Sequence, residues 1–169
     1  MTFAPRVAAD TDPGTWSGLA LTAATIFLEG EGEPDEGRVA IAWVIRNRAN
    51  RQPPTQDVAH VVILGPDRLA DDDGKPWEAF SCFNDDYRAQ RVKRLMYPAA
   101  DVWEQCWRAA AGAWWRLLPD PTAAIGGASH YLNIELTRTI RGGTLPAWAE
   151  LALATDRFIT IGRHTFLRP

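Results

Sequence analysis

The sequence predicts an α+β domain, with helices first and a small antiparallel sheet in the last third of the chain. Apolar residues recur at helical spacing in several segments before residue 120. Two short segments rich in β-prone residues follow, and one of them carries the two-residue loop of a hairpin. The 169 residues match the size of one domain, so we expect a polar N-terminal arm over 1–14 and a single domain over 15–169.

The first two helices are expected to meet at an acidic turn. Apolar side chains follow helical spacing over 15–28. Gly30 and Gly32 end that helix, which leaves Glu29 at its C-terminal edge. A second helix opens at Pro34, because a proline at the first helical position loses no hydrogen bond. Acidic residues in its first turn and basic residues in its last turn match the helix dipole.

Two further helices are expected before the sheet. A short helix is predicted over 55–64, followed by a surface loop over 65–79. The helix over 98–118 is apolar nearly all round, so we expect it to be buried. Basic residues over 88–94 are interpreted as a solvated face, and contact with an anionic polymer is left open.

The last third is expected to form the sheet. Strands are predicted over 128–133 and 158–167, which are short and β-prone. In the second segment, Gly162 and Arg163 separate two apolar halves. Glycine at the first position of a two-residue loop suits a type II′ turn, so this segment is predicted to be a hairpin.

Composition limits the kind of partner. The chain carries 18 Lys and Arg against 21 Asp and Glu, a formal net charge of −3, whereas a nucleic-acid-binding module is normally more basic. No segment approaches the ~18 apolar residues of a membrane span, and the N-terminus lacks the apolar run of a secretory signal. We therefore expect a monomer that is made in the cytoplasm, without a nucleic-acid partner or membrane insertion. Cys82 and Cys106 are interpreted as free thiols, and a single disulfide between them is left open.

The acidic turn is the strongest candidate for chemistry. It reads Glu29-Gly30-Glu31-Gly32-Glu33-Pro34. Glu29 follows an apolar run at the negative end of a helix dipole, and both effects raise a carboxyl pKa, as a general acid needs. Glu31 is expected to be exposed, and Glu33 to cap the second helix or to serve as a secondary candidate acid. The alternative is a solvated turn without chemistry.

No metal and no cofactor are expected. His60, His130 and His164 match no compact ligand motif, and no cysteine pair supports them. The run 71–73 is acidic like a calcium loop, but the further acids of that loop are missing.

Trp148, expected in a loop, is a candidate for stacking on a sugar ring.

Five short motifs occur in one order over about residues 22–166. They are Glu29-Gly30-Glu31-Gly32-Glu33, Val44-Ile45-Arg46-Asn47-Arg48, Phe80-Ser81-Cys82, Asp120-Pro121-Thr122 with Gly127-Ala128-Ser129-His130-Tyr131, and Ile161-Gly162-Arg163-His164-Thr165-Phe166. Together they resemble the bacterial cell wall hydrolase family typified by the spore cortex-lytic enzyme, whose members also occur in phages and prophages. The chain departs from the family at Gly30, where alanine is usual, and at 123–126, which lengthen one link.

The resemblance implies a mainly helical, lysozyme-like domain of the lytic transglycosylase type. Such a domain cuts the β-1,4 bond between N-acetylmuramic acid and N-acetylglucosamine in peptidoglycan, and the residue that matches its acid and base is Glu29. Residues expected to bind the glycan strand are Phe80, Ser81, His130, Tyr131, Asn133 and Trp148. The sequence offers no convincing second acid, which fits transglycosylation with 1,6-anhydro products, and hydrolysis by a muramidase is left open.

Two other classes of function are left open. One is a zinc-dependent amidase or peptidase that acts on the same polymer, and the other is a non-catalytic glycan-binding module. The expected place of action is the cell wall. The chain would reach it as an endolysin released by a holin, on a phage-like particle, or as a host enzyme with another exit.

Overall fold

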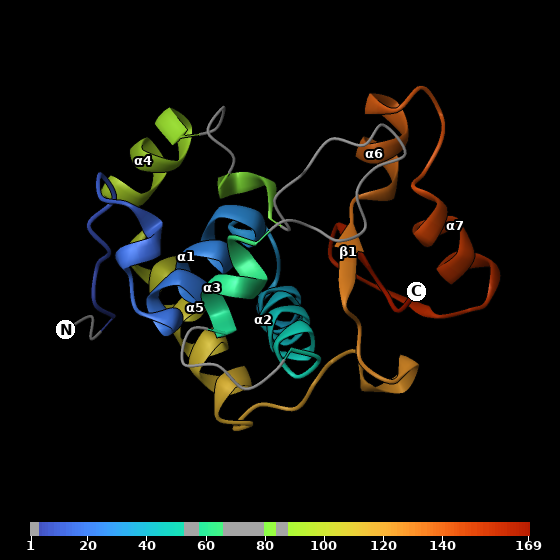
Figure 1. Ribbon diagram of the computed structural model, residues 1–169, viewed down its shortest axis with the longest axis horizontal. Coiled ribbons are helices and arrows are strands. Elements are labelled where there is room, and N and C mark those ends of the chain that lie inside the picture. Colours follow the sequence, from blue (N-terminus) through green and yellow to red (C-terminus); the bar gives the residue numbers. More distant parts are fainter. Residues whose placement is uncertain (1–3, 53–57, 66–79, 84–87) are drawn as a thin grey trace.

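The computed structural model describes residues 4–52, 58–65, 80–83 and 88–169. Figure 1 shows the helices of the first two thirds of the chain gathered on the N-terminal side of the molecule. The last third lies on the other side, with a small sheet and two short helices. The predicted α+β class and the order of its parts are confirmed.

Helix α1 (Gly18–Gly30) is the centre of the helical part. Its N-cap, Ser17, accepts a hydrogen bond from the Ala20 N–H at 3.2 Å. Every residue over 21–28 is buried, because the helix is apolar on all sides and other helices pack around it. The chain is therefore held firmly up to the C-terminal end of α1, where Glu29 lies.

Other helices surround α1 in the described part of the chain. They are α2 (Asp35–Ala49), α3 (Val58–Ile63), α4 (Arg88–Met96) and α5 (Ala100–Trp114). Helix α2 begins at Asp35, one residue after the predicted start, with Pro34 as its N-cap. It lies between the other helices and the sheet (Figure 1). Among the described helices, none is both long and apolar enough to cross a membrane.

The helix expected over 98–118 is shorter in the structure. Helix α5 ends at Trp114, and Arg116 adopts a positive φ of 56°. The Leu117 N–H then bonds back to the Gly112 carbonyl at 2.8 Å. The apolar pattern continues past the residue where the backbone turns, so periodicity alone places this end too late.

An antiparallel sheet with the strand order β1-β3-β2 follows. Its strands are β1 (His130–Leu132), β2 (Phe158–Ile161) and β3 (His164–Leu167). Gly162 and Arg163 form the loop between β2 and β3, and φ is 60° at Gly162 and not positive at Arg163. This is the pattern of a type II′ turn, so the predicted hairpin is confirmed.

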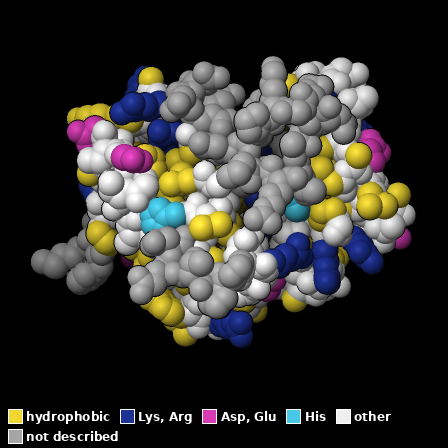
Figure 2. All heavy atoms as spheres, in the orientation of Figure 1, with side chains coloured by type: hydrophobic (Ala, Val, Ile, Leu, Met, Phe, Trp, Pro, Cys, Tyr) yellow, Lys and Arg dark blue, Asp and Glu magenta, His cyan; other side chains and the backbone are white. Residues whose placement is uncertain are grey.

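Two short helices of the last third were not predicted, α6 (Ile134–Ile140) and α7 (Ala147–Ala154). Each has too few turns for hydrophobic periodicity to identify it. Helix α7 packs against β3, and Ala149, Ala152 and Leu167 belong to a second small core there. On the face shown in Figure 2, hydrophobic side chains are visible both over the helical part and over the part that holds α6 and α7.

The described part of the N-terminal arm packs against the helices. The Trp103 indole N–H donates to the Pro5 carbonyl at 3.2 Å, and the Trp16 indole N–H donates to Thr11 Oγ1 at 2.9 Å. Ala9 is buried in the main core. Residues 4–14 therefore pack against the helical part.

Candidate active site

Glu29 lies at the edge of the helical core, at the end of α1. Its side chain is partly buried, and its Oε1 accepts a hydrogen bond from the Cys82 backbone N–H at 3.3 Å. Cys82 belongs to the short 3-10 helix η2 (Ser81–Phe83), so the Phe-Ser-Cys motif is brought beside the acidic turn. Glu29 thus sits on a fixed helix, with a backbone donor on one oxygen and part of its surface open to solvent.

Tyr131 approaches the same carboxylate from the sheet. Its ring packs between those of Phe80, His164 and Phe166, with centroid distances of 6.3, 5.0 and 5.6 Å. Its hydroxyl oxygen is buried and has no hydrogen-bond partner among the described residues. Burial and, after it, the charge of Glu29 raise the pKa of Tyr131 well above its usual range. Tyr131 therefore presents a neutral O–H near the Glu29 carboxylate.

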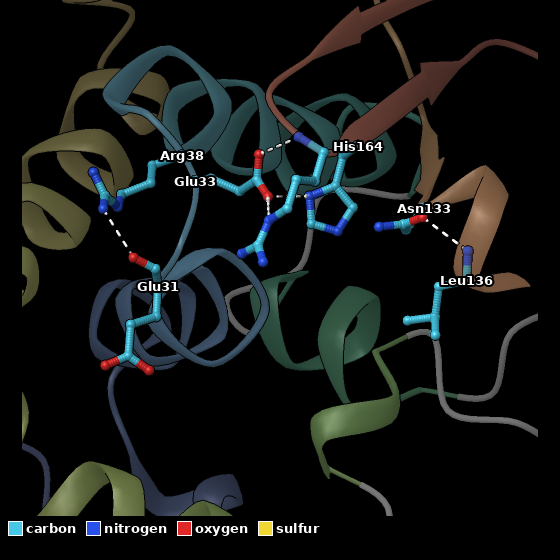
Figure 3. A network of polar contacts seen from close by, with 7 residues as sticks. Glu31, Glu33, Arg38, Asn133, Leu136 and His164 are labelled. Atoms are coloured by element: carbon cyan, nitrogen blue, oxygen red, sulfur yellow. Dashed lines mark hydrogen bonds and ion pairs between the residues drawn. The ribbon is translucent and has the colours of Figure 1, made fainter.

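Glu33 is buried and bound to the hairpin of the sheet. Its carboxylate accepts hydrogen bonds from the backbone N–H and the Nε of Arg163 at 2.9 and 3.1 Å (Figure 3). One of its oxygens lies 3.4 Å from His164 Nδ1. The N-cap of α2 is Pro34, which makes no side-chain cap, so the prediction that Glu33 caps this helix is wrong. We call Glu33, Arg163 and His164 the hairpin clamp.

His164 contacts Glu33 and feels the charges of both Glu33 and Glu29. Burial lowers the pKa of His164, while the charges of Glu33 and Glu29 act in the opposite direction and Arg163 adds to the lowering. The imidazole is therefore mainly neutral near pH 7. Sequence reasoning considered His164 only as a metal ligand, although the closing motif Ile-Gly-x-His-x-Phe was the signal that could have placed it at the site.

Glu31 turns away from this site, as predicted. Its carboxylate is exposed and pairs with Arg94 at 2.9 Å, while its carbonyl accepts a hydrogen bond from buried Arg38 at 3.0 Å. Figure 3 shows the Glu31 side chain pointing away from Glu33. Of the three carboxylates in the acidic turn, Glu31 and Glu33 are thus held in ion pairs, whereas Glu29 accepts from a backbone amide.

A second network holds β1 in place. Asn47 of α2 donates to Asp120 Oδ2 at 3.2 Å and to the Ala128 carbonyl at 3.0 Å. The buried Thr122 hydroxyl donates to Asp120 Oδ1 and accepts the Ala128 N–H, both at 2.7 Å. The Arg48 Nε donates to the carbonyl just before β1. The Asn-Arg and Asp-Pro-Thr motifs are therefore structural, and they fix the strand that carries Tyr131.

The two departures from the family pattern are accommodated locally. A Cβ at Gly30 would lie 2.7 Å from Ile41 Cδ1, so glycine lets α1 and α2 pack closely where the family has alanine. The longer link forms one 3-10 turn, η4 (Ala123–Ile125), which ends at Gly126 with φ of 79°.

His130 and Trp148 lie together, but away from Glu29. Successive side chains of a strand point to opposite faces, so Tyr131 and its neighbour His130 face different sides of the sheet. The rings of His130 and Trp148 pack with centroids 4.8 Å apart. Trp148 belongs to α7, so the prediction that it lies in a loop is wrong. The structure does not bring these two predicted glycan contacts to the Glu29 site.

The remaining predicted contacts have structural partners. Phe80 is 3% exposed, so its ring supports Tyr131 instead of offering a face to solvent. The Asn133 side chain caps α6 by accepting the Leu136 N–H at 2.9 Å (Figure 3). The Ser81 side chain lies outside the described residues, as does the acidic run 71–73.

The basic segment of α4 is partly structural. Arg91 is buried, donates to the Cys82 carbonyl at 3.0 Å and lies over the Phe83 ring. Arg94 donates to the Leu28 carbonyl at 2.8 Å, in addition to its pair with Glu31. These two cations hold η2 and the end of α1 together, so the prediction of a solvated face holds only for the other residues of the segment.

The three histidines do not converge. His60 Nε2 lies 2.9 Å from the Trp16 carbonyl, His130 packs on Trp148, and His164 belongs to the hairpin clamp. Within residues 4–52, 58–65, 80–83 and 88–169, no three His, Cys, Asp or Glu side chains are grouped so that they could hold a metal ion.

Buried His130 is expected to make the fold acid-sensitive. Burial, with smaller contributions from Arg48 and Arg51, lowers the pKa of His130 to about 3. Between that value and the ordinary value near 6.5, the unfolded chain binds more protons than the folded one, so stability falls as pH falls through this window. At pH 4 the free energy of unfolding is therefore expected to be about 3 kcal/mol lower than at pH 7. Urea unfolding at both pH values checks this, and a His130→Gln protein should show a loss smaller by that amount.

A family model for Cell Wall Hydrolase matches residues 32–167, well over half of the chain. The match includes Glu33, the network that holds β1 and the whole sheet, and it begins just after Glu29. No curated protein and no solved structure matches the chain significantly. With most of the chain matched, it belongs to the cell wall hydrolase family and is a peptidoglycan-degrading hydrolase.

Proposed function

We propose that the chain cleaves the β-1,4 bond between N-acetylmuramic acid and N-acetylglucosamine, with Glu29 as general acid and then as general base. The observation that carries this proposal is the state of Glu29. It is partly buried, partly open to solvent and outside the ion pairs that engage Glu31 and Glu33. A group that transfers a proton must reach the substrate and must not be locked in a salt bridge.

In the first step, the Glu29 carboxyl gives its proton to the glycosidic oxygen. The bond from that oxygen to C1 of the muramic acid breaks, and its electron pair stays on the oxygen. The departing N-acetylglucosamine leaves as an alcohol, and positive charge develops at C1. The Cys82 N–H, 3.3 Å from the carboxylate, stabilises the negative charge that Glu29 acquires in this step.

In the second step, the 6-hydroxyl of the same muramic acid attacks C1 and gives its proton to Glu29. A retaining or inverting hydrolase normally uses a second carboxylate at about 5–9.5 Å. The two carboxylates that follow Glu29 in the acidic turn are both engaged: Glu31 points away and pairs with Arg94, and Glu33 is fully buried and bound by Arg163. Because Arg163 holds Glu33, it is not available as a second acid. This supports the intramolecular route, which needs one acid and yields 1,6-anhydro ends.

Mass spectrometry of digested sacculi tests this proposal. The expected products are muropeptides with 1,6-anhydro-muramic acid, lighter by one water than the products of hydrolysis. Reducing muramic acid ends would retain Glu29 as the acid but replace transglycosylation by hydrolysis. Release of stem peptides from intact glycan strands would contradict cleavage of the glycosidic bond.

A further inference from the structure

Cys82 and Tyr131 bring two neutral donors to Glu29 from opposite parts of the chain. Cys82 comes from η2 of the helical part, and Tyr131 comes from β1 of the sheet. Both are protonated hydrogen-bond donors, and both lie close enough to be influenced by the Glu29 charge. The proton-transfer chemistry described above uses neither of these side chains.

The Cys82 thiol is kept protonated by its surroundings. Burial raises the pKa of Cys82 well above its ordinary value, the charge of Glu29 and a hydrogen bond to it raise it further, and Arg91 and Arg94 oppose these effects. Its own backbone N–H already bonds to Glu29 Oε1 at 3.3 Å. The S–H is therefore a weak donor fixed next to the carboxylate, and the thiol is unsuited to act as a nucleophile.

The Tyr131 hydroxyl has no structural use elsewhere. The ring alone makes the contacts with Phe80, His164 and Phe166, and a phenylalanine would make them equally well. Among the described residues no acceptor meets the buried O–H in good hydrogen-bond geometry, and a weak hydrogen bond to Glu29 is the smallest of the contributions to its raised pKa. A buried hydroxyl without a good partner destabilises a fold. Glu29 is the acceptor whose charge acts most strongly on it. Such catalytic hydrogen bonds are often long in the free enzyme and tighten when charge develops.

We propose that Tyr131 and Cys82 are positioning residues. The Tyr131 hydroxyl and the Cys82 thiol donate hydrogen bonds to the Glu29 carboxylate once it has given up its proton. This inference rests on the proposed role of Glu29. The other charged or titratable groups around the three side chains are Arg48, Arg91, Arg94 and His164. Two neutral donors stabilise the new carboxylate without forming the ion pair that would lock it.

Thiol alkylation tests the contact without measuring activity. Iodoacetamide is added to the folded protein at pH 8.5, and the modification of each cysteine is followed by mass spectrometry. The Glu29→Gln substitution removes a charge that raises the pKa of Cys82, so Cys82 is expected to react about tenfold faster. Cys106 is the internal control, because Glu31 and Asp35 are the carboxylates that act on it. Glu31→Gln is the matched variant and leaves the rate at Cys82 unchanged.

Equal alkylation rates at Cys82 in the wild type and in Glu29→Gln would show that the Cys82 thiol does not contact Glu29, and would overturn the proposal. A faster reaction at both cysteines would show that the substitution loosens the fold, and it would also count against the proposal. Because no turnover is involved, these results do not depend on which bond the enzyme cuts. Failure of this test is therefore distinguishable from failure of the proposed function.

Turnover of sacculi tests the positioning role. Tyr131→Phe is expected to lower kcat about 10- to 100-fold with little change in KM, because a hydrogen bond to a charge formed in the transition state is lost. Cys82→Ala is expected to lower kcat by a smaller factor, and Cys82→Ser to restore it, since serine keeps a donor. A kcat at the wild-type level in both Tyr131→Phe and Cys82→Ala would refute the proposal. An equal fall in kcat for Cys82→Ser and Cys82→Ala would do the same for the thiol.

Discussion

Replacing Glu29 by Gln is expected to reduce the rate of sacculus digestion by about 10⁴-fold or more. The substitution keeps the size of the side chain and its contact with the Cys82 N–H, but removes the proton that the reaction transfers. General acid–base catalysis contributes typically 10²–10⁴-fold, and in the proposed mechanism one group serves both steps. The measurement is the release of soluble muropeptides from purified sacculi. Thermal unfolding of the same protein shows whether its fold is retained.

Glu31→Gln is the matched control for this experiment. Glu31 is exposed and pairs with Arg94 on the outside of the turn, so its loss is expected to change the rate less than about threefold. The two variants differ from the wild type by the same chemical change two residues apart. An active Glu29→Gln protein combined with an inactive Glu31→Gln or Glu33→Gln protein would show that the acid has been assigned to the wrong carboxylate.

Gly162→Ala is expected to cause a large loss of stability, because Gly162 packs against Glu33 of the hairpin clamp. A Cβ at Gly162 would overlap Glu33 Oε2 and lie 2.7 Å from Pro34 Cδ. The position also has a φ of 60°, which costs a residue with a side chain about 1–2 kcal/mol. Together with overpacking, the expected loss is about 2–5 kcal/mol. For a chain of this size that lowers Tm by roughly 5–15 °C.

The control for Gly162→Ala is Gly142→Ala. Gly142 has a similar φ of 66°, but no atom lies within 4 Å of the Cβ that alanine would add. This variant therefore carries the backbone strain without the collision, and its Tm is expected to fall by much less. Similar losses in the two variants would show that backbone strain, and not contact with Glu33, decides the effect at Gly162.

The parts of the site that are local in sequence could be predicted. The type II′ turn follows from glycine chemistry within a few residues, and α1 ends at Gly30 and α2 begins one residue after Pro34, close to where the glycines and the proline predict. The same reasoning placed Glu29 at the end of an apolar helix and Glu31 in solvent. These predictions succeed because the backbone conformations involved depend on neighbouring residues.

The parts that depend on distant residues could not be predicted in the same way. A glutamate before a proline at a helix start is typical of a cap, yet Glu33 binds a residue 130 positions later. Trp148 follows a proline, which suggested a loop, but α7 begins there and packs on the second core. In both cases packing overrides the local preference, and one sequence contains no sign of the partner. Motif order indicated that these segments matter, but not what they contact.

The separation in sequence between Glu33 and Arg163 also sets the order in which the parts of the molecule fold. Helices α1 and α2 adjoin in sequence and can form early, whereas closing a loop of 130 residues between Glu33 and Arg163 is slow and comes late. During synthesis, Glu29 leaves the ribosome long before Tyr131 and His164. The surroundings of Glu29 are therefore complete only when nearly the whole chain has been made. If Glu29 has the proposed role, a chain that ends before the hairpin lacks Arg163 and His164 and is expected to be inactive against the wall.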